Sequence, residues 1–355
     1  MSLTSLDNRN VMVIPASPTR AERIRLGIEV MHPRRDPLMV IGHGSSGTSI
    51  CAGLIRKYCG VAFGNESQFM IRFARHAAHF GDLNKAVNLD RLVSDLLRER
   101  YFKRSAEKYG FRPTREQIIA RTREKTCSGV FRAVFELMAE HQQTDRWGDK
   151  TPEYSLHLPE LGCLFPDAQW IYAIRDGRDV ALSVMSRYFG ASNLIMAALE
   201  WRHLAELARQ FLEGKPSESR MTVRYEDMMR DPVATLIRVM DFLQAAPRDP
   251  DMFTRIGPTV RGELKSGTTC KWKSELSPRQ REIFEAIAGD QLRAHGYETE
   301  FDRPRPASRM EMAVAPWDDR LKHWTSPAVW RDSIYRGSMR LRDVGIRVRE
   351  SLRRK

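Results

Sequence analysis

The segment that most constrains the fold is "PLMVIGHGSSGTSICAGLIRKYCG", residues 37–60. A short apolar run, a Gly/Ser-rich loop and an amphipathic stretch follow one another here, which predicts a buried strand, a tight turn and a helix. Such a unit is typical of the start of a doubly wound sheet. We therefore expect an α/β fold, with a P-loop-type parallel sheet flanked by helices.

The same order of strand, loop and helix recurs later in the chain. "QWIYAI" (169–174) runs through "RDGRD" into a helical pattern, and "MTVRY" (221–225) leads into the helical pattern "VATLIRVMDFL". We expect ligands to bind at the carboxyl ends of these strands. The predicted organisation is an N-terminal extension over residues 1–35, a domain over 36–300 with a helical insertion over about 68–145, and a basic helical tail over 301–355.

Composition excludes few classes of protein here. The chain has 42% hydrophobic and 29% charged residues, which is ordinary for a globular protein and argues against wholesale disorder. Five cysteines without C-x-x-C spacing favour reduced thiols over a zinc or redox site. The first residues do not resemble a signal peptide, and no stretch approaches the roughly 20 apolar residues of a spanning helix. We expect a cytoplasmic protein.

Positive charge is concentrated in the predicted tail. Of the net charge of +13, residues 303–355 contribute +8. Between Trp330 and Leu352 the apolar residues fall near one helical face and arginines lie elsewhere, as in a helix that rests on an anionic membrane. Packing of this helix on the domain or on a partner is the alternative. The mildly basic remainder of the chain suits an anionic ligand.

The Gly/Ser loop departs from a nucleotide-binding loop at one position. Gly42, Gly47 and Ser49 match the pattern G-x-x-x-x-G-K-S/T, but Thr48 replaces the lysine. Glycines let the backbone approach a phosphate, and the amides at a helix N-terminus favour an anion. Without a cation for the β and γ phosphates, the ligand need not be a triphosphate and need not bring magnesium. A turn without function is the alternative.

A second anion site is predicted around Arg175, at the end of the strand 169–174, with Ser183 eight residues further on in the next helix. A guanidinium binds phosphate through two parallel hydrogen bonds, and a serine hydroxyl can add a third. The alternative is a strand-end salt bridge from Arg175 to Asp176 or Asp179. We assign no metal, because the lost lysine and the position of Arg175 make Asp176 a poor magnesium ligand.

These segments together carry a resemblance. The loop, "WGDKTP" (147–152), "IRDGRDVALSVMSR", "VRYEDMMRDP" and "CKWKSELSP" have the order and spacing of the sulfotransferases that use 3′-phosphoadenosine 5′-phosphosulfate (PAPS), over roughly residues 36–298. PAPS has a phosphosulfate at its 5′ end and a phosphate at its 3′ end, so two separate anion sites suit it. The resemblance implies that the donor is bound by Gly44, Ser45, Ser46, Gly47, Thr48 and Ser49 at the 5′ end, by Arg175 and Ser183 at the 3′ end, and by Tyr225, Lys271 and Trp272 nearby.

The chain departs from the family at Ser45, where relatives usually carry arginine or lysine. His43 and Lys150 are the nearest substitutes, and of these Lys150 is charged at neutral pH. Sulfuryl transfer, like phosphoryl transfer, depends on in-line positioning and on neutralisation of charge. The match to the family's K-T-P pattern implies that Lys150 neutralises the leaving oxygen. A solvated loop lysine is the alternative.

The resemblance also implies that Glu66, in "FGNESQF", takes the proton of the acceptor hydroxyl. Capping of the next helix is the alternative for this glutamate. His76 and His79 are alternative bases.

The acceptor is less constrained. The predicted insertion contains several arginines, which favours a carbohydrate or glycolipid acceptor over a small phenol or alcohol; they include Arg72, Arg75, Arg98 and Arg100. Two other functions stay open. A degenerate P-loop kinase or hydrolase would need ATP and magnesium, and a basic nucleic-acid-binding protein would depend on the tail, although no zinc or aromatic–basic pattern supports it.

Overall fold

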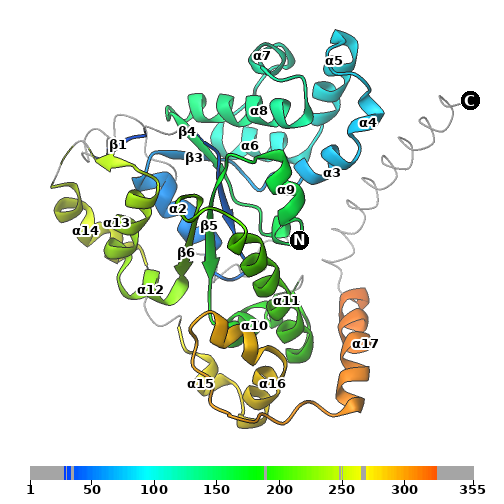
Figure 1. Ribbon diagram of the computed structural model, residues 1–355, viewed down its shortest axis with the longest axis vertical. Coiled ribbons are helices and arrows are strands. Elements are labelled where there is room, and N and C mark those ends of the chain that lie inside the picture. Colours follow the sequence, from blue (N-terminus) through cyan, green and yellow to red (C-terminus); the bar gives the residue numbers. More distant parts are fainter. Residues whose placement is uncertain are drawn as a thin grey trace, which may run out of the picture.

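Five parallel strands form the central sheet in the order β3–β4–β2–β5–β6 (Figure 1). The computed structural model describes residues 28, 30–32, 36–187, 190–247, 249, 251–264 and 269–325. A parallel sheet flanked by helices is the fold class that the sequence predicts, and it is confirmed. The strands are β2 (Leu38–Ile41), β3 (Val61–Phe63), β4 (Arg146–Asp149), β5 (Gln169–Ile174) and β6 (Arg220–Arg224), and a separate antiparallel pair joins β1 (Val30–Met31) to β7 (Ala246–Pro247).

Alternate residues of β2 enter two different cores, as expected for a strand covered on both faces. Leu38 and Val40 pack in one core with residues of α2 (Thr48–Tyr58), α12 (Tyr225–Arg230), α13 (Pro232–Phe242) and α14 (Met252–Glu263). Met39 and Ile41 pack in the other. The helices in this second core include α9 (Leu158–Leu164), α10 (Gly177–Met185), α11 (Leu194–Glu213) and α16 (Pro278–Ala294). Three short helices lie in the connections: η1 (Pro152–Leu156), η2 (Ser217–Ser219) and α15 (Trp272–Glu275).

Strands β3 and β4 are not evident from the sequence pattern, because β3 has only three residues and β4 is "RWGD", which has no apolar run. Strand β4 also contains the buried Arg146. Its Nη2 donates to Gln169 Oε1 at 2.6 Å and its Nε donates to the Asp36 carbonyl at 2.8 Å. A buried guanidinium, stabilised by these hydrogen bonds, thus occupies a position where the pattern of a buried strand would have an apolar side chain.

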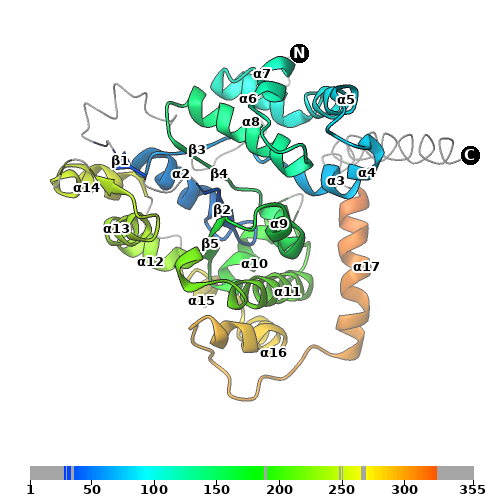
Figure 2. The same ribbon diagram turned by 45° about the horizontal axis from the view of Figure 1, so that its top comes forward.

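Six helices lie between β3 and β4 and form a unit at one end of the molecule (Figures 1 and 2). Phe69 is at the centre of their aromatic packing, 5.4 Å from Tyr101 and 5.5 Å from Phe131 between ring centroids. Phe135 stacks on Trp147 of β4 at 4.7 Å, which fixes the unit to the sheet. The helices are α3 (Met70–Arg75), α4 (Ala77–Phe80), α5 (Ala86–Leu96), α6 (Arg100–Tyr109), α7 (Arg115–Arg121) and α8 (Cys127–His141).

The last described helix, α17 (Arg309–Thr325), stands beside α11 and away from the sheet in both views (Figures 1 and 2). The apolar pattern from Trp330 to Leu352 lies outside the described residues. Within the described part of the chain, the helices are too short or too polar to cross a bilayer. All five cysteines are free, and Cys51, Cys59 and Cys127 are buried.

Arg178 of α10 is buried and contacts residues that follow α14 in the chain. Arg178 is 1% exposed; its Nη2 lies 2.7 Å from Asp176 Oδ2 and its Nη1 lies 2.7 Å from Glu285 Oε1. Its guanidinium also stacks on the Trp272 ring, at 3.5 Å from the centroid. Loss of the cation would leave two buried carboxylates without compensation.

We therefore expect Arg178→Leu to lower the free energy of unfolding by about 3–5 kcal/mol, measured by urea denaturation. The matched control is Arg202→Leu on α11, which removes a solvent-exposed pair with Asp290 at 3.2 Å. This control should change stability by no more than about 1 kcal/mol. Equal effects of the two substitutions would contradict the role given to Arg178.

Candidate functional site

The loop between β2 and α2 holds an unusual backbone. Ser45 and Gly47 have φ values of 78° and 82°, in the left-handed region, and Ser46 N donates to the His43 carbonyl at 3.1 Å. A Cβ on Gly47 would lie 2.4 Å from Tyr225 Cδ2, so glycine is required there for both φ and space. A non-glycine residue such as Ser45 adopts this conformation at a cost in free energy, and backbone strain of this kind is found at ligand-binding loops.

This loop presents uncompensated hydrogen-bond donors at the start of α2. Gly47 caps the helix without a side-chain hydrogen bond, and the first turn contains no acidic residue. The hydroxyls of Ser45 and Ser46 are buried, and neither has a hydrogen-bond partner among the residues that the structure describes. Free amides, the positive end of the helix dipole and buried hydroxyls form a site that fits a phosphate or sulfate group.

The loop is anchored to the segment after β4. Ser155 of η1 accepts a hydrogen bond from Gly42 N at 3.0 Å and donates to the Gly42 carbonyl at 3.1 Å. On the other side His43 Nε2 lies 3.4 Å from Glu200 Oε1 of α11. His43, which the sequence offers as a substitute cation, is therefore next to a carboxylate.

The register of β3 and β4 brings Glu66 and Lys150 together. Phe63 pairs with Gly148, so the residues that follow leave the sheet side by side. Ser67 N donates to Thr151 Oγ1 at 2.9 Å, and Ser67 Oγ lies 2.9 Å from the Tyr154 hydroxyl. These buried bonds fix the segment that carries Glu66 against the segment that carries Lys150.

Glu66 and Lys150, the two predicted catalytic residues, form an ion pair. Lys150 Nζ lies 2.5 Å from Glu66 Oε1. The side chains are 35% and 16% exposed respectively, so both are reachable from solvent. A carboxylate and a cation thus lie within hydrogen-bond distance at the carboxyl end of the sheet, and the next helix, α3, has Phe69 at its N-cap with no side-chain cap hydrogen bond.

The alternative bases lie elsewhere. His76 joins α3 to α4, and the buried His79 has its ring edge-on to Phe80, 5.2 Å away between centroids. Both histidines are therefore on the helical unit, His76 between α3 and α4 and His79 within α4.

Asp149, at the end of β4, is a buried carboxyl that sequence reasoning did not single out. It is 4% exposed, and burial raises its pKa to about 7. Hydrogen bonds from Thr151 and Ser67 and the charge of Lys150 act in the opposite direction. Its position directly before Lys150 in "GDKTP" is the only signal that the sequence offers.

Arg175 follows β5 and faces the loop. Its Nη1 donates to the Ser45 carbonyl at 3.4 Å, and its guanidinium lies 4.6 Å from the centroid of the Tyr225 ring. The predicted alternative is also present, since Nη2 lies 3.4 Å from Asp179 Oδ2. Asp176 pairs with Arg178 instead. The two predicted anion sites therefore lie at the same edge of the sheet.

Asp179 also positions Lys271 and Trp272. It is 1% exposed and accepts hydrogen bonds from Cys270 N at 2.8 Å and Trp272 N at 3.0 Å. Trp272 is buried, whereas Lys271 is exposed. One carboxylate thus holds both Arg175 and the turn that carries Lys271.

The helix α10 contributes a regular series of polar residues. Asp179 and Ser183 are one turn apart on α10, and Ser183 is partly buried. Arg187 follows at the same spacing, just beyond the helix. Burial and the nearby charge of Arg175 lower the Arg187 pKa. Sequence reasoning missed this second cation, although the four-residue spacing from Arg175 to Arg187 was available to find it.

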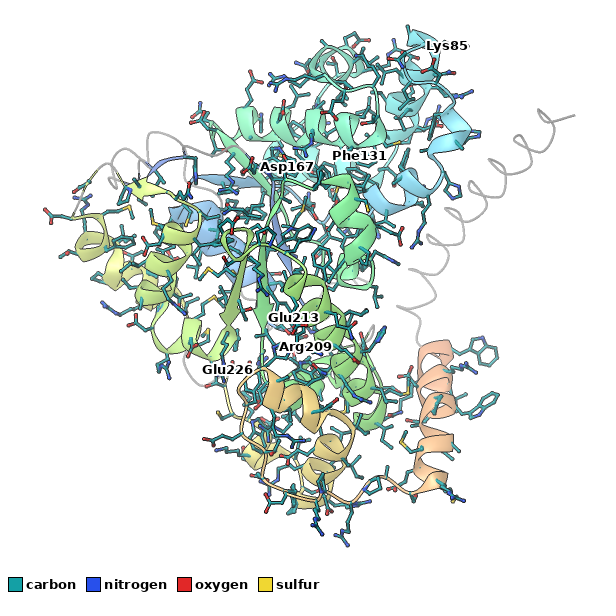
Figure 3. All side chains as sticks on the ribbon, in the orientation of Figure 1. Lys85, Phe131, Asp167, Arg209, Glu213 and Glu226 are labelled. Atoms are coloured by element: carbon teal, nitrogen blue, oxygen red, sulfur yellow. The ribbon has the colours of Figure 1, made fainter. Side chains whose placement is uncertain are left out.

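Two cavities lie at the opposite edge of the sheet. They measure about 950 and 760 Å³, and both are lined by Asp167, which precedes β5. Figure 3 shows Asp167 close to Phe131, far from Glu226 at the carboxyl edge. Arg132, which lines both cavities, forms an ion pair with Asp167. Neither cavity includes the loop, Glu66 or Arg175.

Fold and site together define an α/β protein with a glycine- and serine-rich loop after its central strand, and comparisons with known proteins identify its family. The model of the sulfotransferase family matches residues 37–249. This chain belongs to the sulfotransferase family, which confirms the resemblance of its motifs.

Individual relatives are distant. A Caenorhabditis elegans protein named as a protein-tyrosine sulfotransferase is 27% identical over 128 residues, which are 34% of this chain and 49% of that protein. The chain thus spans about half the length of this curated relative.

Two solved structures are also similar. The sulfotransferase domain of the Synechococcus PCC 7002 olefin synthase has 18% identity and a TM-score of 0.49, over 75% of this chain and 97% of that chain. A mouse sulfotransferase complexed with PAP has 12% identity and a TM-score of 0.40, over 74% of this chain and 86% of that chain.

The pKa of Asp149 predicts a pH-dependent stability. An unfolded aspartate loses its proton near pH 4, whereas folded Asp149 keeps it up to about pH 7. Between these values the folded state binds more protons, so the wild type should lose stability relative to Asp149→Asn as the pH rises from 5 to 7. The slope is at most about 1.4 kcal/mol per pH unit, measured by urea denaturation of both proteins. A difference independent of pH would contradict the assignment.

Proposed function

We propose that this chain transfers a sulfuryl group from PAPS to an acceptor hydroxyl on a carbohydrate or glycolipid. The main support is the position of Arg175, whose Nη1 lies 3.4 Å from the carbonyl oxygen of Ser45 in the loop. A guanidinium and a helix N-terminus at one edge of the sheet suit a nucleotide with separate anionic groups.

The residues present fit the two ends of PAPS. The unpartnered hydroxyls of Ser45 and Ser46 and the amides at the start of α2 would hold the 5′-phosphosulfate. Arg175 and Ser183, with Arg187 beyond them, would hold the 3′-phosphate. Because Thr48 replaces the loop lysine, a nucleoside triphosphate would lack its usual cation. This favours PAPS over ATP.

Glu66 and Lys150 supply the chemistry in this proposal. The acceptor oxygen forms a bond to sulfur while the bond from sulfur to the phosphate oxygen breaks. Glu66 takes the acceptor proton, and the Lys150 ammonium neutralises the charge that develops on the leaving oxygen. Their separation of 2.5 Å supports a role for both groups at one reacting centre.

Two of the arginines that favour a carbohydrate acceptor have carboxylate partners in the structure. Arg72 pairs with Glu99 at 2.7 Å, and Arg75 pairs with Glu160 at 2.5 Å. To bind an anionic saccharide, these arginines would have to release their carboxylate partners first. A neutral glycan hydroxyl requires no such exchange.

The direct test is transfer of labelled sulfate from PAPS to a panel of glycans, glycolipids, phenols and tyrosyl peptides, without added magnesium. Thermal shifts with adenosine 3′,5′-bisphosphate and with ATP–magnesium test the donor separately, because a ligand of the folded state raises its stability. Stabilisation by ATP–magnesium alone would favour the degenerate kinase or hydrolase. Transfer to tyrosyl peptides alone would keep the donor and replace the acceptor.

Arg175→Ala should weaken the binding of adenosine 3′,5′-bisphosphate roughly 100-fold, because two charge-assisted hydrogen bonds are lost. Isothermal titration calorimetry measures this directly. The matched control is Arg209→Ala on α11, whose Nη1 donates to Glu213 Oε1 of the same helix at 2.6 Å. Its affinity should equal that of the wild type. Arg175→Ala with unchanged affinity would remove Arg175 from the donor site.

Glu66→Gln should lower kcat by about 10²–10⁴-fold, because the amide cannot accept the acceptor proton. The affinity for adenosine 3′,5′-bisphosphate should stay unchanged. Glu116→Gln, at an exposed position of α7, is the matched control. An unchanged kcat in Glu66→Gln would transfer the role of the base to His76 or His79, which His→Ala variants would then identify.

A further inference from the structure

Helix α17 exposes a continuous apolar face. Six of the nine large apolar side chains that are exposed among the described residues belong to this helix. Five of them recur at intervals of four and three residues, which places them within roughly 80° of the helix circumference. They are Met310 (77% exposed), Val314 (51%), Trp317 (69%), Leu321 (60%) and Trp324 (69%).

The opposite side of α17 docks on the start of α11. Ala315 is 6% exposed, and its carbonyl accepts a hydrogen bond from Asn193 Nδ2 at 2.9 Å. Ser192 N donates to Asp319 Oδ1 at 2.7 Å. The helix therefore has a fixed orientation on the domain, with its apolar face directed away from the docked side.

The carboxylates of α17 are engaged in local contacts. Glu311 accepts from Ser308 N at 2.7 Å, and Asp318 pairs with Lys322 at 3.2 Å and accepts from Asn193 Nδ2 at 3.1 Å. Beside the apolar face lies Arg320, with its guanidinium 5.5 Å from the centroid of the Trp317 ring. The exposed face thus combines tryptophan, aliphatic side chains and a cation.

Residues 326–355, which follow this helix, have a net charge of +6. An apolar helical face with two tryptophans, continued by a strongly basic segment, matches the chemistry of an anionic bilayer surface. A second copy of the chain would bring two such basic segments together, and their repulsion disfavours a dimer through this face.

We propose that α17 is a peripheral membrane-binding helix, which docks the domain on anionic lipid through Met310, Val314, Trp317, Leu321 and Trp324. The basic segment 326–355 supplies the electrostatic attraction. Stable peripheral binding needs two such signals, since a single apolar anchor is only marginal. The proposal does not depend on the donor or acceptor under "Proposed function", because lipid binding is measured without catalysis.

The test is co-flotation of the full chain with vesicles of phosphatidylcholine containing about 30% phosphatidylglycerol, compared with phosphatidylcholine alone. We expect binding to the anionic vesicles that decreases with salt. The triple variant Trp317→Gln/Leu321→Gln/Trp324→Gln should partition at least about tenfold more weakly. The control Val87→Gln changes a side chain on α5 that is 73% exposed, and it should bind like the wild type.

Quenching of tryptophan fluorescence by brominated lipid separates α17 from the segment after it. Trp147, Trp170, Trp201 and Trp272 are at most 4% exposed, so their fluorescence should not respond. Quenching should persist in Trp330→Phe and largely disappear in Trp317→Phe/Trp324→Phe.

Three outcomes would overturn the proposal. The first is wild-type flotation of the triple variant, with its fold verified by its thermal melting. The second is quenching that requires only Trp330. The third is light scattering that shows a dimer in the wild type and a monomer in the triple variant, because the face would then be an interface between two copies.

Discussion

The site depends on the common direction and register of the strands. Gly148 of β4 lies beside Phe63 of β3 and Leu38 of β2, so the segments after these strands leave the sheet at the same edge. A Cβ on Gly148 would lie 2.7 Å from Phe63 Cζ and 2.8 Å from the Leu38 carbonyl oxygen, so only glycine allows this approach. The loop and the Glu66–Lys150 pair owe their position at a common edge to this strand packing, and Arg175 in addition contacts the loop directly through the Ser45 carbonyl.

Electrostatics at the carboxyl edge favour an anion. Arg175 is 8% exposed, and burial of a guanidinium is costly unless a counter-charge is near. Asp179 provides that counter-charge, but burial raises the Asp179 pKa and the same carboxylate accepts two backbone hydrogen bonds. Arg187 adds a second cation, and burial together with the charge of Arg175 lowers its pKa. Two guanidinium groups near one buried carboxylate suit the phosphate of the proposed donor.

The sequence is sufficient to predict those parts of the fold and site that local patterns specify. Strands β2 and β5 are apolar runs, and the loop and Arg175 directly follow them. Strand β3 has only three residues and β4 has no apolar run, so neither strand was predicted and the contact of Glu66 with Lys150 could not be derived from spacing. The resemblance implied only a separate role for each residue. The exposed face of α17 could not be predicted either, because its heptad-like spacing is equally typical of a helix that packs on a core.

The Glu66–Lys150 ion pair affects how the lack of a basic residue at position 45 can be compensated. Lys150 is bound to Glu66, and His43 lies near Glu200, so neither is a simple replacement for a basic residue in the loop. In the proposed chemistry, however, the proton that Glu66 accepts also neutralises its charge. The carboxyl group then holds Lys150 less strongly, and the ammonium becomes available as negative charge develops on the leaving oxygen. Such coupling would supply the cation at the step that needs it, without a permanent positive charge in the loop.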